Sequence, residues 1–440
     1  MSSATSTSFR CVEHVVPCQY MREYVAATAS EEDVLSLAVK QYIPLDNPSP
    51  HAGDVTILAA HANSLPKETY EPLWEEIYSR WKASGIRIRG VWMADAAHQG
   101  RSGVLNEAML GNDPSWFDHP RDLLHLVNLK HAEMPQPIVG IGHSMGGAHL
   151  ISLSLIHPRL LYSLVLLDPI IQRQVTELDD GGRFDNKRTI RETTQLSTYR
   201  RDRWPSRQVA AEAFNHSSFY QSWDPRAMER WVQYGLRDLP TAIHPLGKRE
   251  LKARGGQGRP VTLTTTRHQE VFTFSRPLYD ETDQPGTRVT HPDVDPLLLS
   301  DFPFYRPELS RIFEQLPHLR PSTLYVFGGR CMMCQPELRA DELRMTGTGV
   351  GGSGGVPAGR VRQVVLPPFG HLLAQEAANE CADSIVDWLG PELQRWQEEN
   401  HQFRAAWKKK GKVERMTVDE LWKKHVPPLR PTSVETSAKL

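Results

Sequence analysis

A serine set among glycines is the side chain of this sequence best placed to act as a nucleophile. The stretch "GIGHSMGG" holds Gly142-His143-Ser144-Met145-Gly146, a G-x-S-x-G pattern between a strand-like apolar run and a helix-forming run. On such a strained strand-to-helix turn the glycines avoid clashes, and the serine hydroxyl is lifted above the sheet. The pattern predicts covalent catalysis by Ser144. It also leaves the backbone N–H of Met145 pointing towards a substrate.

A nucleophilic serine requires a base, and position in the chain selects His371. This histidine lies in "LPPFGHLLAQE", immediately after the last predicted strand. A loop at that place is expected to fold back over the serine turn. We therefore predict that His371 accepts the proton of the Ser144 hydroxyl.

The base in turn requires a carboxylate to orient its ring, because the wrong tautomer loses most of the rate. The turn after the strand "TLYVFGG" has no acid: it reads Gly329-Arg330-Cys331-Met332-Met333-Cys334. The run "VLLDPI" instead places Asp168 at the end of another strand. Neighbouring strands lie only about 4.8 Å apart, so a carboxylate moved over by one strand still reaches the same imidazole.

Asp168 is therefore the predicted acid. The alternative is a turn-forming role for Asp168 at its Asp-Pro junction. Asp341 and Glu342 lie inside a predicted helix, which makes them poorer candidates for the acid.

Alternating strands and helices must position these residues. Apolar runs typical of strands occur at residues 9–16, 35–42, 55–60, 86–95, 137–142, 161–168, 323–329 and 361–367. Helical periodicity occurs at residues 67–85, 120–133, 145–156 and 336–345. This alternation predicts an α/β fold with a mostly parallel sheet and helices on both of its faces.

The alternation lapses between Asp168 and Thr323. The intervening segment has helical stretches of its own and a "VTLTTT…VFTF" pair that is expected to form a hairpin. We interpret this segment as a large cap inserted between two core strands. The predicted organisation is a core at residues 1–169 and 321–390, a cap at 170–320 and a helical tail at 391–440.

The composition excludes several function classes. The chain has 440 residues, of which 39% are hydrophobic and 23% charged, so it can bury a sizeable core. Its 51 basic and 52 acidic residues give a net charge of −1, which indicates neither a nucleic-acid nor a membrane partner. No run approaches the ~18 apolar residues of a membrane span. The N-terminus also lacks the pattern of a secretory signal.

Five cysteines form an odd, sparse set that suits a reducing compartment. The pair Cys331-x-x-Cys334 invites a redox or zinc interpretation, but no second pair accompanies it. The chemistry predicted above requires neither a metal nor a redox cofactor.

The chain ends in Ala438-Lys439-Leu440, which is similar to the peroxisomal import tripeptide Ser-Lys-Leu. We therefore expect an import receptor as a partner and the peroxisomal matrix as the location. The tail before it is basic and carries Trp396, Trp407 and Trp422. Its apolar side chains are expected to pack against the cap or against a second copy of the chain, which favours a homodimer.

Residues 9–169 and 321–390 resemble the α/β-hydrolase superfamily, whose chain order of serine, acid and histidine matches Ser144, Asp168 and His371. The acid before the cap, the large cap, the "HAN…LPKE" turn and the C-terminal tripeptide are more particular. They resemble fungal peroxisomal hydrolases of secondary metabolism, such as those of mycophenolic acid and host-selective toxin biosynthesis. The resemblance implies a serine thioesterase that releases a free acid from an acyl-CoA.

Two alternatives to a thioesterase remain open. The nearer one is a carboxylesterase or lipase that uses the same three residues on oxygen esters. The remoter one is a hydrolase fold that binds a ligand without catalysis.

The same resemblance implies where an oxyanion would be held. Residues Asn63-Ser64-Leu65-Pro66 resemble the His-Gly-x-Pro turn of many α/β-hydrolases. This assigns one N–H donor to Met145 and the second to Leu65, with Ser64 next in line. The run "DAAHQGRSG" from Asp95 resembles a turn that borders the pocket in this fold, and we interpret it as structural.

Two basic runs could receive the phosphates of coenzyme A. From Arg183 to Arg207 there are eight basic residues and three acidic ones, a net charge of +5. From Lys248 to Arg259 there are five and one, a net charge of +4. A solvated cap surface explains this charge equally well. The residues predicted to bind substrate are Ser64, Arg201, Arg203 and Arg207.

Overall fold

The computed structural model describes residues 8–173, 175–177, 183–245, 259–279, 282, 284–291 and 303–429. The chain forms two compact units, Met1–Glu392 and Leu393–Leu440. The predicted import tripeptide and most of the basic run at 248–259 lie outside the described residues, as do the side chains of Arg183, Lys187 and Arg188.

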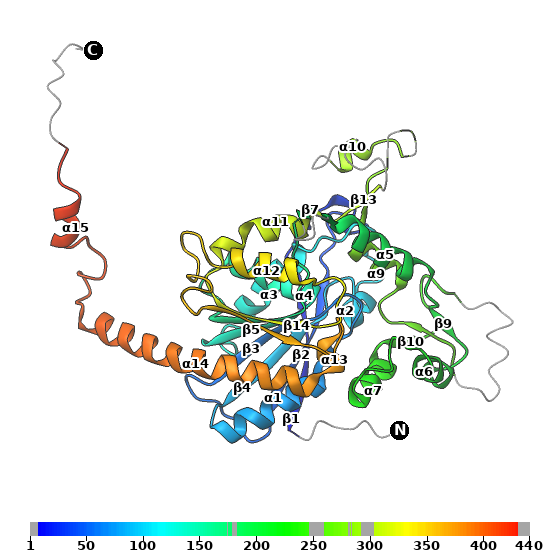
Figure 1. Cartoon of the computed structure of the whole chain (residues 1–440), viewed down its shortest axis with the longest axis horizontal. Helices are drawn as coiled ribbons and strands as arrows, with labels where there is room; N and C mark the ends of the chain where they lie inside the picture. Colours follow the sequence, from blue (N-terminus) through cyan, green and yellow to red (C-terminus); the bar gives the residue numbers. More distant parts are fainter. Residues whose placement is uncertain are drawn as a thin grey trace, which may run out of the picture. The chain divides into compact units, whose positions relative to one another are not determined.

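An eight-stranded sheet forms the centre of the first unit (Figure 1). Its strands lie in the order β1 (Phe9–Pro17), β2 (Ser36–Pro44), β4 (Ile88–Ala94), β3 (Val55–Ala60), β5 (Ile138–His143), β6 (Ser163–Leu167), β14 (Ser322–Gly328) and β15 (Val361–Leu366). Neighbours are parallel, except that β2 is antiparallel to β1 and β4. Every residue of β3, β5, β6 and β14 is buried, as apolar strands covered on both faces must be. The predicted mostly parallel sheet is confirmed.

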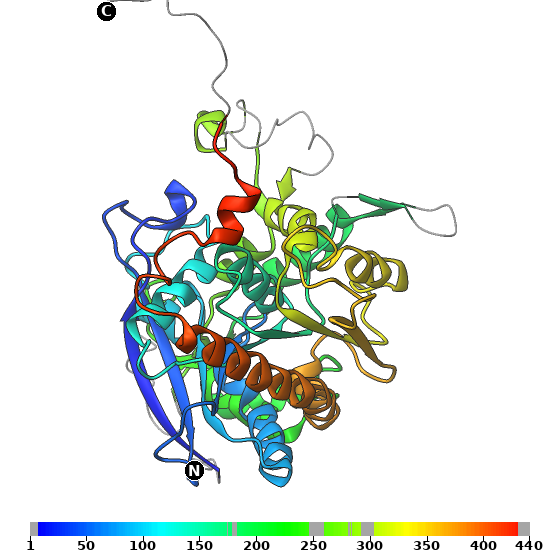
Figure 2. The same ribbon diagram turned by 90° about the vertical axis from the view of Figure 1, so that its left-hand side faces the viewer.

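Helices cover both faces of this sheet (Figures 1 and 2). On one face α3 (Asp118–Leu129), α4 (Met145–Ile156) and α11 (Pro307–Gln315) pack together. On the other face α1 (Glu71–Ser84) lies beside the first part of α14 (Ala378–Lys409), and Arg80 of α1 binds Asp383 of α14. Shorter helices are α2 (Gly100–Leu105), α12 (Pro336–Met345) and α13 (Leu373–Glu376).

The sequence of α1 shows why such a helix forms and ends where it does. Its buried side chains Leu73, Trp74, Ile77 and Trp81 recur at helical spacing and face the sheet. The helix ends at Gly85, whose φ of +78° is the left-handed conformation that glycine adopts without strain.

The segment between β6 and β14 consists of short elements. They are β7 (Val175–Glu177), β8 (Arg183–Asp185), α5 (Asn186–Tyr199), β9 (Arg203–Trp204), α6 (Arg207–Asn215), α7 (Pro225–Tyr234), β10 (Leu236–Asp238), β11 (Val261–Leu263), α9 (Arg267–Phe274), β12 (Arg276–Pro277), α10 (Thr287–Thr290) and β13 (Phe304–Tyr305). At its end α11 joins the main core, because Leu309, Ile312 and Phe313 share one apolar cluster with side chains of α4.

The predicted hairpin within this segment is wrong. Its first half forms β11, which pairs with β10 and β9. Its second half is the helix α9, which begins after Thr266, whose side chain accepts the N–H of Gln269. A threonine cap of this kind satisfies a backbone donor at a helix start, so it favours the helix over a second strand.

In the second unit α14 continues to Lys409, and α15 (Glu420–His425) follows it. Phe403 and Trp407 stack within α14, with ring centroids 5.8 Å apart. In the described part of the chain, no helix combines the length and the apolar character that a membrane span needs.

Candidate active site

Ser144 lies at the tip of a sharp turn between β5 and α4. Its φ of +53° and ψ of −118° are a strained conformation for a residue with a side chain. A Cβ on Gly142 would lie 2.6 Å from the Gly146 carbonyl oxygen, and one on Gly146 would lie 2.1 Å from that of Ala60. Both glycines are therefore required by close packing, and together they hold Ser144 at the carboxyl end of β5.

His371 connects Ser144 to Asp168. Its Nε2 lies 2.8 Å from Ser144 Oγ, and its Nδ1 lies 3.1 Å from Asp168 Oδ2. Asp168 is fully buried, and its N–H donates to the carbonyl of Val326 in the adjacent strand β14. The other carboxylate oxygen accepts the N–H of Gly328 at 3.3 Å. The structure thus brings together the three side chains that the sequence selected.

Opposing effects set the charge of His371. Burial lowers its pKa, but the hydrogen bonds with Asp168 and Cys331 outweigh burial and raise the pKa. The neighbouring anionic groups therefore favour the imidazolium, which is the form that a general base takes after it removes a proton. In the neutral ring a proton on Nδ1 faces Asp168, and Nε2 accepts from the Ser144 hydroxyl.

The histidine inside the G-x-S-x-G turn ties the loop of His371 to the turn after β3. His143 Nε2 donates to the carbonyl oxygen of His371 at 2.9 Å, so its Nδ1 accepts from the Tyr70 hydroxyl at 2.9 Å. The same hydroxyl accepts the N–H of Ala62 at 2.8 Å. Burial lowers the pKa of His143 to about 3, which keeps the ring neutral. Sequence reasoning missed these contacts, since no local pattern distinguishes Tyr70 from a packing residue.

A thiol lies at the turn where the sequence lacks an acid. Cys331 follows β14, and its Sγ lies 3.5 Å from His371 Nδ1. Within the described ranges, Asp168, Cys331 and His371 offer donor atoms that all lie within 4.8 Å of one another. Sequence reasoning considered this turn as a source of the acid, but it did not predict that the Cys331 thiol would contact His371.

Backbone N–H groups near Ser144 determine where an oxyanion could be held. The N–H of Met145 starts α4 and has no acceptor in the described part of the chain. Ser64 has a φ of +64°, and its N–H donates to Gln99 Oε1 at 2.8 Å. Leu65 donates to the Ala62 carbonyl over a longer 3.2 Å. The N–H of Ser64, the second-choice donor, therefore already has a close acceptor, whereas the N–H of Leu65 makes only a long hydrogen bond.

The turn that begins at Asp95 has a structural role. Asp95 Oδ1 accepts the backbone N–H of Lys67 at 3.0 Å, and Asp95 Oδ2 lies 2.6 Å from Lys67 Nζ. Gly100 has a φ of +52°, and a Cβ there would lie 2.4 Å from Asp95 Cγ. The charged side chains of Asp95 and Lys67 are both buried. Asp95 thus joins the turn after β4 to the turn that carries Leu65.

Asp95→Ala is expected to lower the free energy of unfolding by about 3 kcal/mol, because the buried Lys67 ammonium would keep only Glu68, at 3.2 Å, a carboxylate that it shares with Lys40. Urea denaturation at neutral pH measures the change. Lys130→Ala is the control, since it removes a partly exposed pair with Glu133 at 3.2 Å and should cost less than about 1 kcal/mol. Similar small losses in both variants would contradict the structural role of Asp95.

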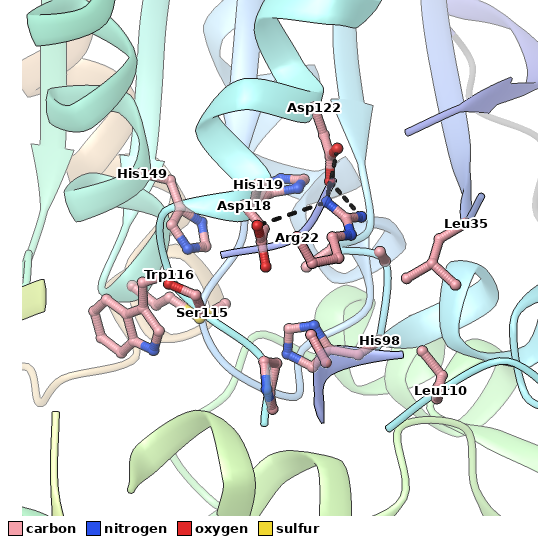
Figure 3. Close-up of a pocket in the computed structure, with 15 residues that line it drawn as sticks. Arg22, Leu35, His98, Leu110, Ser115, Trp116, Asp118, His119, Asp122 and His149 are labelled. Atoms are coloured by element: carbon pink, nitrogen blue, oxygen red, sulfur yellow. Dashed lines mark hydrogen bonds and ion pairs between the residues drawn. The ribbon is translucent and has the colours of Figure 1, made fainter. Parts of the chain in front are cut away.

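Figure 3 shows a small cavity lined by His98, His119 and His149. Met145, the residue after Ser144, also lines it. Its volume of about 20 Å³ suits about one water molecule and is too small for an acyl chain. Burial lowers the pKa of all three histidines, so they are neutral. A larger cavity of about 480 Å³ lies between β2 and β10, and none of Ser144, Asp168 and His371 lines it.

The three arginines predicted to bind substrate have different surroundings. Arg207 already has protein acceptors at the end of α7, namely the carbonyls of Val232, Gln233 and Leu236. Its guanidinium therefore holds a helix end instead of being free for a ligand. Arg201 and Arg203 are exposed, and the Arg201 guanidinium lies 5.5 Å from the centroid of the Trp204 ring.

Comparisons with known proteins extend these observations. The model of the Alpha/beta hydrolase family matches residues 57–384. The type I acyl-CoA thioesterase mpaH' of Penicillium brevicompactum is 40% identical over 436 residues, which cover 97% of each chain. The abhydrolase domain-containing protein AFT2-1 of Alternaria alternata is 29% identical over 260 residues, 58% of this chain and 84% of that protein.

Among solved structures, the peroxisomal alpha-beta-hydrolase Lpx1 of Saccharomyces cerevisiae is similar with a TM-score of 0.62 and 16% identity. The similarity covers 94% of this chain and 100% of that one. At this identity the likeness shows a shared fold. The family match over most of the sequence and the identity with mpaH' show that this chain is a hydrolase of the alpha/beta hydrolase family.

Proposed function

We propose that this chain hydrolyses acyl-CoA thioesters to a free acid and coenzyme A, with Ser144, His371 and Asp168 as its catalytic residues. The observation that carries the proposal is the line of hydrogen bonds from Ser144 Oγ through both ring nitrogens of His371 to Asp168, with lengths of 2.8 and 3.1 Å. The identity with a relative named as a type I acyl-CoA thioesterase supports the thioester class.

In the first half of the reaction His371 Nε2 takes the hydroxyl proton while Ser144 Oγ attacks the thioester carbonyl carbon. The resulting oxyanion accepts the N–H groups of Met145 and Leu65, and Leu65 gives up its long bond to Ala62. One such donor is worth roughly 3 kcal/mol in the transition state. The C–S bond then breaks, His371 Nε2 gives its proton to the departing sulfur, and coenzyme A leaves as its thiol.

In the second half a water molecule attacks the acyl-enzyme. His371 Nε2 takes the proton of this water, and the same two N–H groups hold the second oxyanion. The Ser144 ester bond then breaks as His371 gives this proton to Ser144 Oγ, which restores both side chains. Asp168 keeps the proton of the ring on Nδ1 throughout. Each step therefore uses groups of this chain and water.

Arg201 and Arg203 are the proposed contacts to the phosphates of coenzyme A. Replacing both with alanine is expected to raise KM for an acyl-CoA about three- to ten-fold, since exposed charge pairs contribute up to about 1 kcal/mol each. The matched N-acetylcysteamine thioester has no phosphates, so its KM should stay unchanged. An equal rise for both substrates would mean that the variant disturbs the cap instead.

The proposed function is tested with a panel of CoA thioesters and the matching simple oxygen esters, with the released acid measured by chromatography. A preference for the thioesters is expected. A preference for the oxygen esters would favour a carboxylesterase. If neither is hydrolysed and a fluorophosphonate does not label Ser144, the chain is a ligand-binding protein.

Three further parts of the proposal concern location and assembly. The terminal Ala438-Lys439-Leu440 is proposed to bind the peroxisomal import receptor and to direct the chain to the matrix, where it would serve fungal secondary metabolism. Deleting these three residues from a fluorescent fusion should leave it in the cytosol.

The apolar side chains of the tail are proposed to support a homodimer. A monomer mass in light scattering would refute this proposal.

A further inference from the structure

Two buried cysteines stand beside the proposed base. The turn after β14 carries Cys331 and Cys334, and the Cys331 sulfur lies 3.5 Å from His371 Nδ1. The Cys334 thiol lies within reach of two acceptors: the Cys331 sulfur, to which it hydrogen-bonds, and the Pro169 carbonyl oxygen at 3.8 Å. In the proposed reaction neither sulfur forms a bond or exchanges a proton.

The two thiols differ in their acidity. The hydrogen bond from Cys334 lowers the pKa of Cys331, burial opposes it, and the hydrogen bond and charge of His371 bring the pKa to about 6. The hydrogen bond to Cys331 and burial raise the pKa of Cys334 well above its usual value. Burial likewise raises the pKa of Cys11, Cys18 and Cys381. Of the five cysteines, Cys331 is therefore the one whose thiol ionises most readily.

We propose that Cys331 is a site of reversible oxidation by hydroperoxides, that Cys334 converts the oxidised form to a disulfide, and that this modification suspends hydrolysis. Cys331 is 6% exposed, and it contacts His371, whose side chain is 19% exposed, so only a small oxidant such as hydrogen peroxide suits this site. The first two statements rest on the contacts and the acidity of the two cysteines and not on the proposed function. The third rests on the proposed function.

The chemistry balances without any other reactant. The Cys331 thiolate attacks one oxygen of hydrogen peroxide, so that an S–O bond forms, the O–O bond breaks and hydroxide leaves, taking up a proton to become water. The Cys334 sulfur then attacks the sulfur of this sulfenic acid and releases its own proton. An S–S bond forms, the S–O bond breaks and a second water leaves. Two thiols are oxidised and one peroxide is reduced, and a dithiol reductant reverses the change.

Oxidation would disturb the proposed base directly. His371 Nδ1 has two neighbours, Asp168 at 3.1 Å and the Cys331 sulfur at 3.5 Å. A sulfenic oxygen at Cys331 would compete with Asp168 for the Nδ1 proton, and a disulfide would remove the negative charge of the thiolate. Either change weakens the interactions that stabilise the imidazolium formed when Ser144 reacts.

The test compares the full-length chain with Cys331→Ser, Cys334→Ser and the control Cys381→Ser, each treated with hydrogen peroxide in the presence of EDTA. Mass spectrometry after dimedone trapping identifies the modified cysteine without reference to activity. The rate of fluorophosphonate labelling of Ser144 and the rate of acyl-CoA hydrolysis, each relative to the same untreated variant, report the consequence.

The unmodified chain and Cys381→Ser are expected to form the disulfide between residues 331 and 334 and to lose about ten-fold in labelling rate, which dithiothreitol restores. In Cys334→Ser dimedone should modify Cys331, and dithiothreitol should restore the labelling rate only poorly. After peroxide treatment Cys331→Ser should keep the labelling rate and the hydrolysis rate that it had before treatment. Circular dichroism checks the folding of each variant.

Three results would overturn the proposal: equal inactivation of Cys331→Ser, a reduced pair of cysteines after treatment, or recovery by additional chelator alone. The last would instead indicate a metal held by Asp168, Cys331 and His371. If the disulfide forms and slows Ser144 labelling while no acyl-CoA is hydrolysed, the oxidation site stands and only the thioesterase proposal fails.

Discussion

Asp168→Asn is expected to lower kcat/KM for an acyl-CoA by about 10⁴-fold, the loss seen when the acid of such a triad becomes an amide. Asp168 Oδ2 lies 3.1 Å from His371 Nδ1, and an asparagine amide can turn its NH₂ group to this nitrogen. The ring would then carry its proton on Nε2 and could not accept one from Ser144. Steady-state kinetics on the purified variant measure the loss.

Asp341→Asn is the matched control for this prediction. The Asp341 carboxylate lies 2.7 Å from Arg173 Nε and also contacts Arg344, so it serves an ion pair on α12. Its loss should change kcat/KM by less than about three-fold, because such a partly exposed pair contributes up to about 1 kcal/mol. Glu342→Gln should behave similarly, since burial raises the pKa of Glu342 and so favours the uncharged form that glutamine imitates. Small, equal losses at positions 168 and 341 would mean that another group orients His371.

Ser144→Ala is expected to have the largest effect of all, a loss of about 10⁶-fold in kcat, because covalent catalysis requires the hydroxyl. Labelling by a fluorophosphonate should disappear at the same time. Substrate binding should change little, since the glycines and not the hydroxyl set the shape of the turn. Kinetics together with an equilibrium binding measurement separate the two effects.

The double variant Ser144→Ala with His371→Ala provides the stricter test. Residues that act as one unit show strongly non-additive losses, so the double variant should be hardly slower than Ser144→Ala alone. Additive losses would mean that His371 acts independently of Ser144. The bond of 2.8 Å between the two side chains would then be a resting contact without a role in proton transfer.

The fold was predictable because its central strands are almost continuously apolar. β3, β5, β6 and β14 match the predicted strands closely, and α4 and α12 have the predicted bounds. Prediction failed where a local signal was ambiguous. The β-branched run from Val261 to Thr266 starts as a strand, but Thr266 caps a helix, and the partners of β11 come from distant parts of the chain.

The proposed catalytic residues could be found from the sequence because each lies at the end of a predicted strand. Parallel strands place their carboxyl ends along one edge, so Ser144 after β5, Asp168 after β6 and His371 after β15 were expected at the same edge, although the loop with His371 must cross the end of β14 to reach the other two. Contacts between loops carry no such signal. The approach of Cys331 to His371 and the link from Tyr70 to His143 depend on how separate loops bend, which spacing does not encode.

The pairing of β6 with β14 has a consequence for biosynthesis. The N–H of Asp168 reaches its partner, the carbonyl of Val326, only across the whole inserted segment. Contacts between residues so far apart in the chain form slowly. They also form late, because β14 leaves the ribosome long after β6. If the proposed roles hold, a nascent chain that already displays the turn with Ser144 would remain inert until β14 docks and the last strand positions His371, the proposed base.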